Sequence, residues 1–239
     1  SNVVPKPENL SFEEAASIPL VGMTALQVLK ASGLKEGNSI LITGGAGGVG
    51  TMAIQLAKHV FKAGLVVTTA SKGEKERLCK SLGADVVIDY KSARFEEIYG
   101  GKDAEKFDVC FDTTGESLKM SDIVKEGGRI VTIAGMATLE ELRRIGGTAW
   151  ILKLFVKRRM KRKEYKAAQS KNADWSYLFL SPSQDDLSTL VKHLESSAIK
   201  PVLDGVWDFH SEDDEDGWRG AFNRSFSGRA KGKCVVKIV

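Results

Sequence analysis

The chain has 239 residues, which is enough for one or two domains of ordinary size. Apolar residues make up 42% and charged residues 28% of it, and this composition excludes a disordered chain, which would have fewer apolar residues and a larger net charge. The formal net charge is only +4, so charge alone does not favour a nucleic-acid partner. No apolar run approaches the roughly 20 residues of a membrane-spanning helix, and we expect no membrane span.

Cysteine and histidine are sparse. Cys79, Cys110 and Cys234 are far apart in the sequence, and the three histidines form no HExxH pattern, so we expect neither a metal site nor a disulfide framework. Residues 1–7 are polar and contain two prolines, unlike a signal or transit peptide. We therefore expect a reducing compartment, the cytoplasm by default, with an organelle as the alternative.

Short apolar runs alternate with amphipathic segments along the chain. Runs that are apolar throughout are typical of parallel strands covered by helices on both faces, so the sequence predicts an α/β fold with a doubly wound parallel sheet. Gly83 is expected to end the second helix as a C-cap residue. In chain order, the pattern predicts a strand over 39–43, a helix over 51–61, a strand over 65–69, a helix over 74–82, and strands over 85–89, 107–112, 129–134 and 177–180.

Two charged runs interrupt this alternation. Residues 153–166 contain eight basic residues, opposed only by Glu164, and residues 212–216 are five consecutive acids. The basic run is interpreted as a helix with a basic outer face, and binding to nucleic acid or an anionic membrane is kept as the alternative. Its only aromatic residues are Phe155 and Tyr165, which leaves little for base stacking. The acidic run is expected to be a solvated loop.

A glycine-rich turn, GGAGGVG over residues 44–50, links the first predicted strand to the first predicted helix. Glycines allow a tight turn and a close approach by a pyrophosphate, which the N–H groups and dipole of the helix N-terminus then hold. The strand–turn–helix context favours dinucleotide binding. The alternative is a glycine-rich turn without a ligand.

The end of the second predicted strand bears on which dinucleotide would bind. NAD-binding proteins place an acidic residue there for the ribose hydroxyls, about 20 residues after the glycine turn. This chain has Ser71 and Lys72 there and no acid, a combination that suits a 2′-phosphate and predicts NADPH as the cofactor. Ser71 could instead cap a helix that begins near Lys72, and the two roles can coexist.

Several motifs occur together in a recognisable order. They are NLSFEEAASIPLVGMTAL over 9–26, GGAGGVG over 44–50, LGAD over 82–85, GGR over 127–129, the segment 187–202, and GRAKGK over 228–233. With them the whole chain resembles the zinc-independent quinone oxidoreductase branch of the medium-chain dehydrogenase/reductase superfamily, which includes zeta-crystallin and plant enone reductases.

The resemblance implies roles for particular residues. It places Thr24 near the nicotinamide and Lys233 near the phosphates, and a solvated side chain remains the alternative for Lys233 and for Tyr90. The remaining implied contacts are Ala46, Gly47, Gly48 and Val49 with the pyrophosphate, Ser71, Lys72 and Tyr90 with the 2′-phosphate, and Ile133, Ala134, Gly135, Leu178, Phe179 and Leu180 with the nicotinamide half.

The resemblance also implies a domain organisation. Residues 1–20 would be a linker at the end of a catalytic domain, 21–205 the NADP-binding Rossmann domain, and 206–239 a remnant of a GroES-like β domain, most of which this chain lacks. We therefore assign no catalytic residue. Zinc-dependent relatives carry a ligand cysteine in the region equivalent to 20–23, and this chain has none, which disfavours zinc catalysis.

The implied activity is zinc-independent hydride transfer from NADPH to a quinone or an α,β-unsaturated carbonyl. Related proteins commonly dimerise through an edge of the cofactor-domain sheet, so a homodimer is expected. Two alternatives from other classes stay open. One is a nonenzymatic fragment that only binds NADPH, and the other is an anion- or nucleic-acid-binding module that uses residues 153–166.

Overall fold

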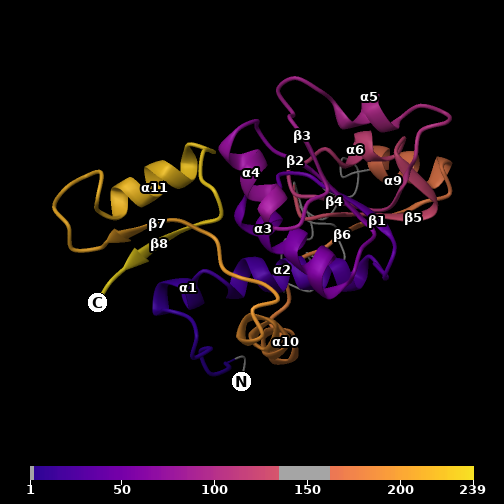
Figure 1. Ribbon diagram of the computed structural model, residues 1–239. Helices are drawn as coiled ribbons and strands as arrows, with labels where there is room; N and C mark the ends of the chain where they lie inside the picture. The colour runs from indigo at the N-terminus through magenta and orange to yellow at the C-terminus, as the bar shows by residue number, and fades with distance from the viewer. Residues whose placement is uncertain (1–2, 135–161) are drawn as a thin grey trace, which may run out of the picture.

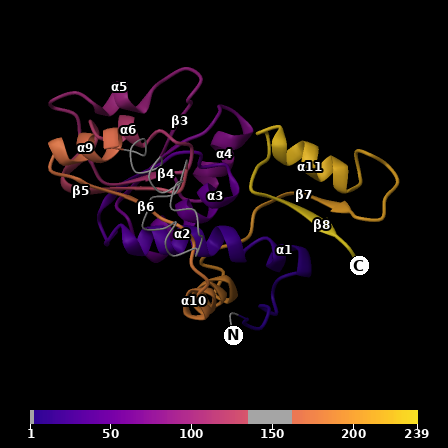
Figure 2. The same ribbon diagram turned by 180° about the vertical axis from the view of Figure 1, so that it is seen from behind.

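The computed structural model describes residues 3–134 and 162–239. Gly135 and most of the basic run therefore lie outside the described residues. Figures 1 and 2 show a large part built on a parallel sheet and, to one side of it, a small unit formed by the C-terminal segment. Within the described ranges, no helix is both long and apolar enough to cross a bilayer.

The large part contains a six-stranded parallel sheet with the strand order β3-β2-β1-β4-β5-β6. This order confirms the predicted doubly wound sheet, because the chain moves outward in one direction from β1 and then returns to build the other half. The strands are β1 (Ser39–Ile42), β2 (Leu65–Thr69), β3 (Val86–Ile88), β4 (Phe107–Asp112), β5 (Val124–Thr132) and β6 (Asp174–Tyr177).

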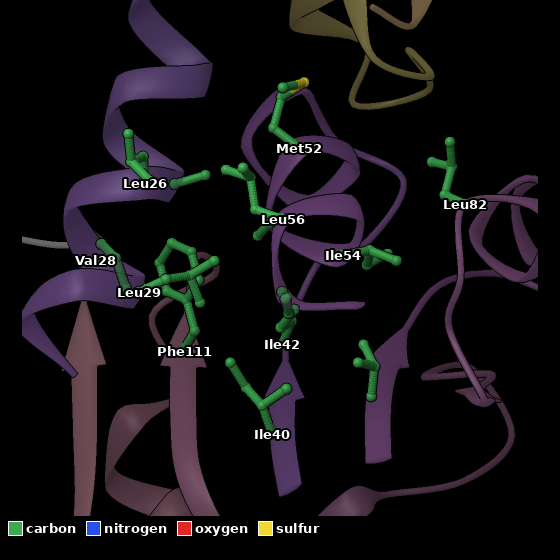
Figure 3. Close-up of a cluster of buried hydrophobic side chains, with 14 of the residues drawn as sticks. Leu26, Val28, Leu29, Ile40, Ile42, Met52, Ile54, Leu56, Leu82 and Phe111 are labelled. Atoms are coloured by element: carbon green, nitrogen blue, oxygen red, sulfur yellow. The ribbon is translucent and has the colours of Figure 1, made fainter. Parts of the chain in front are cut away.

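Helices cover both faces of this sheet and form two buried clusters. On one face, Ile40 and Ile42 of β1 pack with α2 and α3, whereas Leu41 of the same strand faces the opposite cluster. Figure 3 shows the first cluster, where Leu29 of α2 lies beside Phe111 and Leu26 of the same helix lies nearer Leu56. The helices are α1 (Phe12–Ala16), α2 (Pro19–Ala31), α3 (Gly48–Gln55), η1 (Leu56–Val60), α4 (Glu74–Ser81), α5 (Phe95–Tyr99), α6 (Ser117–Met120), α9 (Arg162–Ser170), α10 (Gln184–Glu195) and α11 (Trp218–Phe226).

Three predicted elements differ from the structure by more than one residue at an end. The strand expected over 129–134 is β5, which begins five residues earlier and ends at Thr132, because its first half contains the exposed Glu126 and Gly127 and shows no apolar run. The last strand of the large sheet was expected over 177–180, but β6 is Asp174–Tyr177, so Leu178, Phe179 and Leu180 follow the strand. β6 lies at the edge of the sheet and only Trp175 within it is buried, so a search for a continuous apolar run misses it. The helix expected over 51–61 is α3 followed by one turn of π-helix, η1.

Other predictions from the sequence are confirmed. β2 and β4 have the predicted bounds, and Gly83 follows α4 with a φ of 109°, a conformation that favours glycine. The described end of the basic run is a helix, α9, on which Lys163 and Lys166 are exposed and Ala168 is buried against the sheet. That part fits the interpretation of a basic outer face.

The small C-terminal unit consists of β7 (Leu203–Asp208), α11 and β8 (Lys233–Lys237). β7 and β8 form a parallel two-stranded sheet, and β7 begins three residues before the boundary expected at 206. The acidic run over 212–216 is exposed between β7 and α11, which confirms the predicted solvated loop. This unit meets the large part through an ion pair between Lys237 and Glu13 of α1, with N–O 3.3 Å, and through the glycine turn described below.

Candidate cofactor site

The glycine turn connects β1 to α3 and folds back tightly on itself. Gly44 has a φ of +67°, and a Cβ atom placed on Gly50 would lie 2.2 Å from the Gly44 carbonyl oxygen. A Cβ on Gly45 would lie 2.1 Å from Thr68 Oγ1, so the turn also packs against β2 without room for a side chain. The close packing lets α3 begin at Gly48, directly after the turn, with the N–H groups of its first turn at the positive end of the helix dipole.

A pocket of about 300 Å³ opens beside this turn, at the carboxyl ends of β1, β2 and β4. This is where open α/β sheets bind ligands. Of the residues predicted to bind the cofactor, Ala46, Gly47, Ser71 and Tyr90 line the pocket. The other lining residues are Gly44, Thr69, Ala70, Lys75, Thr113, Thr114, Gly228 and Ala230.

Lys75 is the pocket cation that the sequence analysis missed. It is the second residue of α4, and its Nζ donates a hydrogen bond to the Gly228 carbonyl at 3.3 Å. Burial lowers the pKa of Lys75, and the positive charge of Arg224 lowers it further. An anion bound in the pocket would stabilise the charged form of this side chain.

The predicted pair Ser71 and Lys72 is only partly brought to the pocket. Ser71 lines it, whereas Lys72 is exposed and is not among the lining residues. The alternative role of Ser71 as a helix cap is wrong, because α4 starts at Glu74 with Gly73 as its N-cap residue. The signal that was overlooked is Gly73, whose φ of 93° delays the helix and places Lys75 in its first turn.

The C-terminal segment reaches back to the glycine turn. The Gly232 N–H donates to the Ala46 carbonyl at 2.9 Å. The half-buried Lys233 side chain lies so close that a Cβ on Gly48 would come within 2.9 Å of its Cδ. Tyr90 is more open, with 58% of its surface exposed while it lines the pocket. Tyr90 therefore lines the pocket, Lys233 lies beside the glycine turn without lining the pocket, and the phosphate contacts of both residues stay predictions.

The residues expected at the nicotinamide half lie at the ends of β5 and β6. The Ile133 N–H donates to the Asp112 carbonyl at 3.0 Å, and the Leu178 N–H donates to the Thr132 carbonyl at 2.9 Å, so the two segments leave neighbouring strands side by side. Phe179 is half exposed. Thr24 is buried on α2, and its hydroxyl donates to the Leu20 carbonyl at 2.7 Å; Thr24 does not line the pocket.

A side-chain clamp holds the segment after β6. Gln27 of α2 donates through Nε2 to the Ser181 carbonyl at 2.7 Å and accepts from the Ser181 N–H at 3.1 Å, as a backbone partner would. Asp186 accepts from Gln27 at 2.8 Å and pairs with Lys30 at 2.6 Å. Burial alone would raise the pKa of Asp186, but the hydrogen bonds from Lys30 and Gln27 outweigh it, and the pKa lies below its ordinary value. No motif in the sequence signals this clamp, because it joins residues that are more than 150 positions apart.

The arrangement suits a dinucleotide. The helix N–H groups at the glycine turn, with the Ser71 hydroxyl and the Lys75 ammonium group beside them, offer contacts to phosphates. The neighbouring ends of β5 and β6 offer a surface for a flat ring. Within 3–134 and 162–239, no three His, Cys, Asp or Glu side chains come together in a way that could hold a metal ion.

Known proteins resemble this chain in sequence and in fold. The family described as zinc-binding dehydrogenase matches residues 48–170. The 2-methylene-furan-3-one reductase of Solanum lycopersicum is 38% identical over 97% of this chain and 48% of its own length. The NADPH-dependent alkenal/one oxidoreductase, chloroplastic, of Arabidopsis thaliana is 35% identical over the same shares.

A solved structure extends the comparison. The quinone oxidoreductase from Coxiella burnetii superposes with a TM-score of 0.77 at 28% identity, over 99% of this chain and 64% of that one. The chain spans about half the length of the curated relatives that it matches. From these matches, from the strand order and from the glycine turn, the chain belongs to the zinc-binding dehydrogenase family, among the quinone-oxidoreductase-like members of the medium-chain dehydrogenase/reductase superfamily.

Proposed function

We propose that this chain forms the cofactor-binding part of an NADPH-dependent oxidoreductase that reduces a quinone or an α,β-unsaturated carbonyl. The observation that carries the proposal is the pocket in which the glycine turn, Ser71 and Lys75 meet. The names of the tomato and Arabidopsis relatives point to enone-type acceptors, and the name of the Coxiella protein points to quinones.

The preference for NADPH over NADH rests on the chemistry at the end of β2. A 2′-phosphate carries negative charge, which a hydroxyl and an ammonium group can hold and a carboxylate would repel. Ser71 and Lys75 provide those two groups, and the pocket lining contains no Asp or Glu. We include Lys72 and Tyr90 as outer contacts of the same phosphate.

The bound nicotinamide would supply the hydride, and the protein would supply position and shelter from water. Ala46, Gly47, Gly48 and Val49 would face the pyrophosphate, with Lys233 beside them. Ile133 and Ala134, together with the clamped segment over 178–180, would flank the nicotinamide ring and exclude water from its face. Zinc-independent transfer belongs to the proposal, because no cysteine occurs over 20–23.

We further propose that residues 21–205 form the cofactor domain, that 1–20 lead into it, and that 206–239 belong to a second, GroES-like domain. Every residue of β7 and β8 is at least partly exposed, and α11 exposes Phe222 and Phe226, as expected of a unit that normally packs against more protein. A homodimer that pairs through a sheet edge, in the cytoplasm or an organelle, completes the proposal. Sedimentation of a monomer at micromolar concentration would contradict the dimer.

The test is a titration with NADPH and NADH, followed by nicotinamide fluorescence, and then an assay for NADPH consumption with a simple quinone and a simple enone. We expect tight NADPH binding, weaker NADH binding, and turnover of at least one acceptor class. Binding without turnover of either acceptor would favour the nonenzymatic alternative. No binding of either nucleotide would overturn the proposal, and salt-dependent binding of RNA or DNA would then favour the basic run as the functional feature.

A further inference from the structure

The last residue of β4, Asp112, is a wholly buried carboxylate that the sequence analysis did not single out. Its Oδ1 accepts the backbone N–H groups of Thr114, Gly115 and Glu116 at 3.1, 2.8 and 2.9 Å. Its Oδ2 accepts the N–H of Ser117 at 3.0 Å. One side chain therefore holds the whole loop between β4 and α6, the loop that brings Thr114 to the pocket.

The same carboxylate reaches the two neighbouring strands. Thr43, which follows β1, donates its hydroxyl to Oδ1 at 3.3 Å, and Thr132, the last residue of β5, donates its hydroxyl to Oδ2 at 2.8 Å. Thr43 Oγ1 in turn accepts the Thr113 N–H at 3.0 Å, and Thr132 Oγ1 accepts the Ala134 N–H at 3.1 Å. Asp112 thus joins the ends of three adjacent strands.

These three strand ends carry different parts of the candidate site. Thr43 directly precedes the glycine turn, Thr113 and Thr114 of the loop after β4 line the pocket, and Ile133 and Ala134 are the residues expected at the nicotinamide. A displacement of any one relative to the others would separate the phosphate contacts from the ring contacts. Even a small displacement of this kind lowers the rate of a reaction in which the reacting atom must be held in place.

Six donors surround this side chain, and a carboxylate suits them because it only accepts hydrogen bonds. It offers about four lone-pair sites, so some of the six donors share a site. The amide of asparagine keeps one oxygen and replaces the other with a donor, which would face the Ser117 N–H and leave it without an acceptor. A buried carboxylate is tolerated only when it is compensated to this extent.

We propose that Asp112 is a positioning residue of the cofactor site, whose carboxylate fixes the glycine turn, the β4–α6 loop and the end of β5 in one relative geometry. The inference rests on the proposed function, because the geometry matters for a dinucleotide that spans all three. The alternative is a local role, in which Asp112 stabilises only its own loop.

The first experiment needs no nucleotide. Amide hydrogen exchange is compared between the wild type, Asp112→Asn and the control Asp108→Asn. Asp108 lies at the other end of β4, where it accepts from the Ser39 N–H at 2.8 Å and pairs with Lys125 at 2.9 Å, away from the pocket. We expect Asp112→Asn to raise exchange together over 43–48, 113–117 and 132–134, and Asp108→Asn to leave these three segments unchanged.

The second experiment measures the dissociation constants of NADPH and of adenosine 2′,5′-bisphosphate, which lacks the nicotinamide half. Asp112→Asn should weaken NADPH binding by about tenfold, the effect of one buried donor left unpaired. Thr132→Val keeps the side-chain volume and the loop after β4, but it removes the hydrogen bond from Thr132 to Asp112 and the one from the Ala134 N–H to Thr132. This variant should change the fluorescence of bound NADPH. It should leave the dissociation constant of adenosine 2′,5′-bisphosphate within about twofold of the wild-type value.

The outcomes separate the two proposals. Two results for Asp112→Asn would each overturn the positioning role. One is amide exchange that rises only over 114–117, and the other is an NADPH affinity within about twofold of the wild type. If Asp112→Asn does not fold, Thr132→Val decides alone, and unchanged fluorescence of its bound NADPH would overturn the role. If the wild type binds neither nucleotide, the proposed function fails, while the exchange pattern still decides whether Asp112 couples the three strand ends.

Discussion

The large sheet and the small C-terminal unit are held together in different ways. Every residue of β1 is buried, and helices pack on both faces of the sheet. In the C-terminal unit every strand residue is at least partly exposed, and Ala221 is the only buried residue of α11. Burial of apolar surface therefore stabilises the sheet, whereas polar contacts must account for much of the order in the small unit. The comparison shows where substitutions should be costly.

The largest contrast is expected between two phenylalanines. Phe111 of β4 is wholly buried, and Phe226 of α11 is 84% exposed. Phe111→Ala leaves a cavity and should lower the free energy of unfolding by about 3–5 kcal/mol, whereas Phe226→Ala should change it by less than about 0.5 kcal/mol. Urea unfolding of both variants measures the difference. A large loss from Phe226→Ala would show that a partner or a second copy covers α11.

The glycine turn should be the next most sensitive feature. Gly50→Ala forces a Cβ against the Gly44 carbonyl oxygen, so the turn must open. We expect a loss of about 2 kcal/mol or more in stability, together with loss of nucleotide binding. Gly101→Ala is the matched control, because its Cβ would meet only Ala104 Cβ at 3.7 Å. Wild-type NADPH affinity in Gly50→Ala would show that the turn does not face the nucleotide.

The polar contacts of the small unit should make it sensitive to acid. Arg224 holds the carboxylate of Asp204 in β7, a residue whose side chain is only 2% exposed although its backbone is partly open, through Nε at 2.5 Å and Nη2 at 2.9 Å. The Lys231 N–H adds a third bond at 2.9 Å. The hydrogen bond from Arg224 is the main reason that the pKa of Asp204 lies below its ordinary value of 3.8.

A carboxyl with a lowered pKa stabilises the folded state above its ordinary pKa, and that stability is lost as the pH falls through the lowered value. We expect amide exchange in 203–237 to rise below about pH 4 before exchange in the large sheet does. Asp204→Asn should cost about 1–2 kcal/mol at neutral pH and remove this part of the acid response. If amide exchange rises at the same pH in the small unit and in the large sheet, the two regions are not stabilised in the different ways described above.

The smallest expected effect concerns the clamp on the segment after β6. Gln27→Ala removes both hydrogen bonds to Ser181 and should cost about 1 kcal/mol, mostly as local opening. Amide exchange over 178–182 should rise while exchange in β1 stays the same. The fluorescence of bound NADPH should shift if this segment covers the nicotinamide. Gln184→Ala is the control, because the Gln184 side chain donates to the Val3 carbonyl at 3.3 Å and, among the described residues, forms no hydrogen bond with the segment over 178–182.

The large sheet could be predicted from sequence because its central strands are apolar on both faces. The runs over 65–69 and 107–112 have the same bounds in the structure. β6 could not be predicted in the same way, because an edge strand has only one buried face. The run LFL over 178–180, which follows β6, is also more apolar than the strand itself. Among the site residues, the glycine turn carries its own signal. Lys75 and Asp112 do not, since their roles depend on where α4 begins and on bonds between distant strand ends.

The most direct test of the account is the ratio of NADH to NADPH dissociation constants in Lys75→Ala. Lys80→Ala is the control, because Lys80 lies on the same helix, pairs with Glu76 and is not among the residues that line the pocket. If Lys75 holds the 2′-phosphate, Lys75→Ala should weaken NADPH binding by about tenfold and leave NADH binding unchanged, whereas Lys80→Ala should leave the binding of both nucleotides unchanged. An unchanged ratio in Lys75→Ala would contradict the placement of NADPH in this pocket.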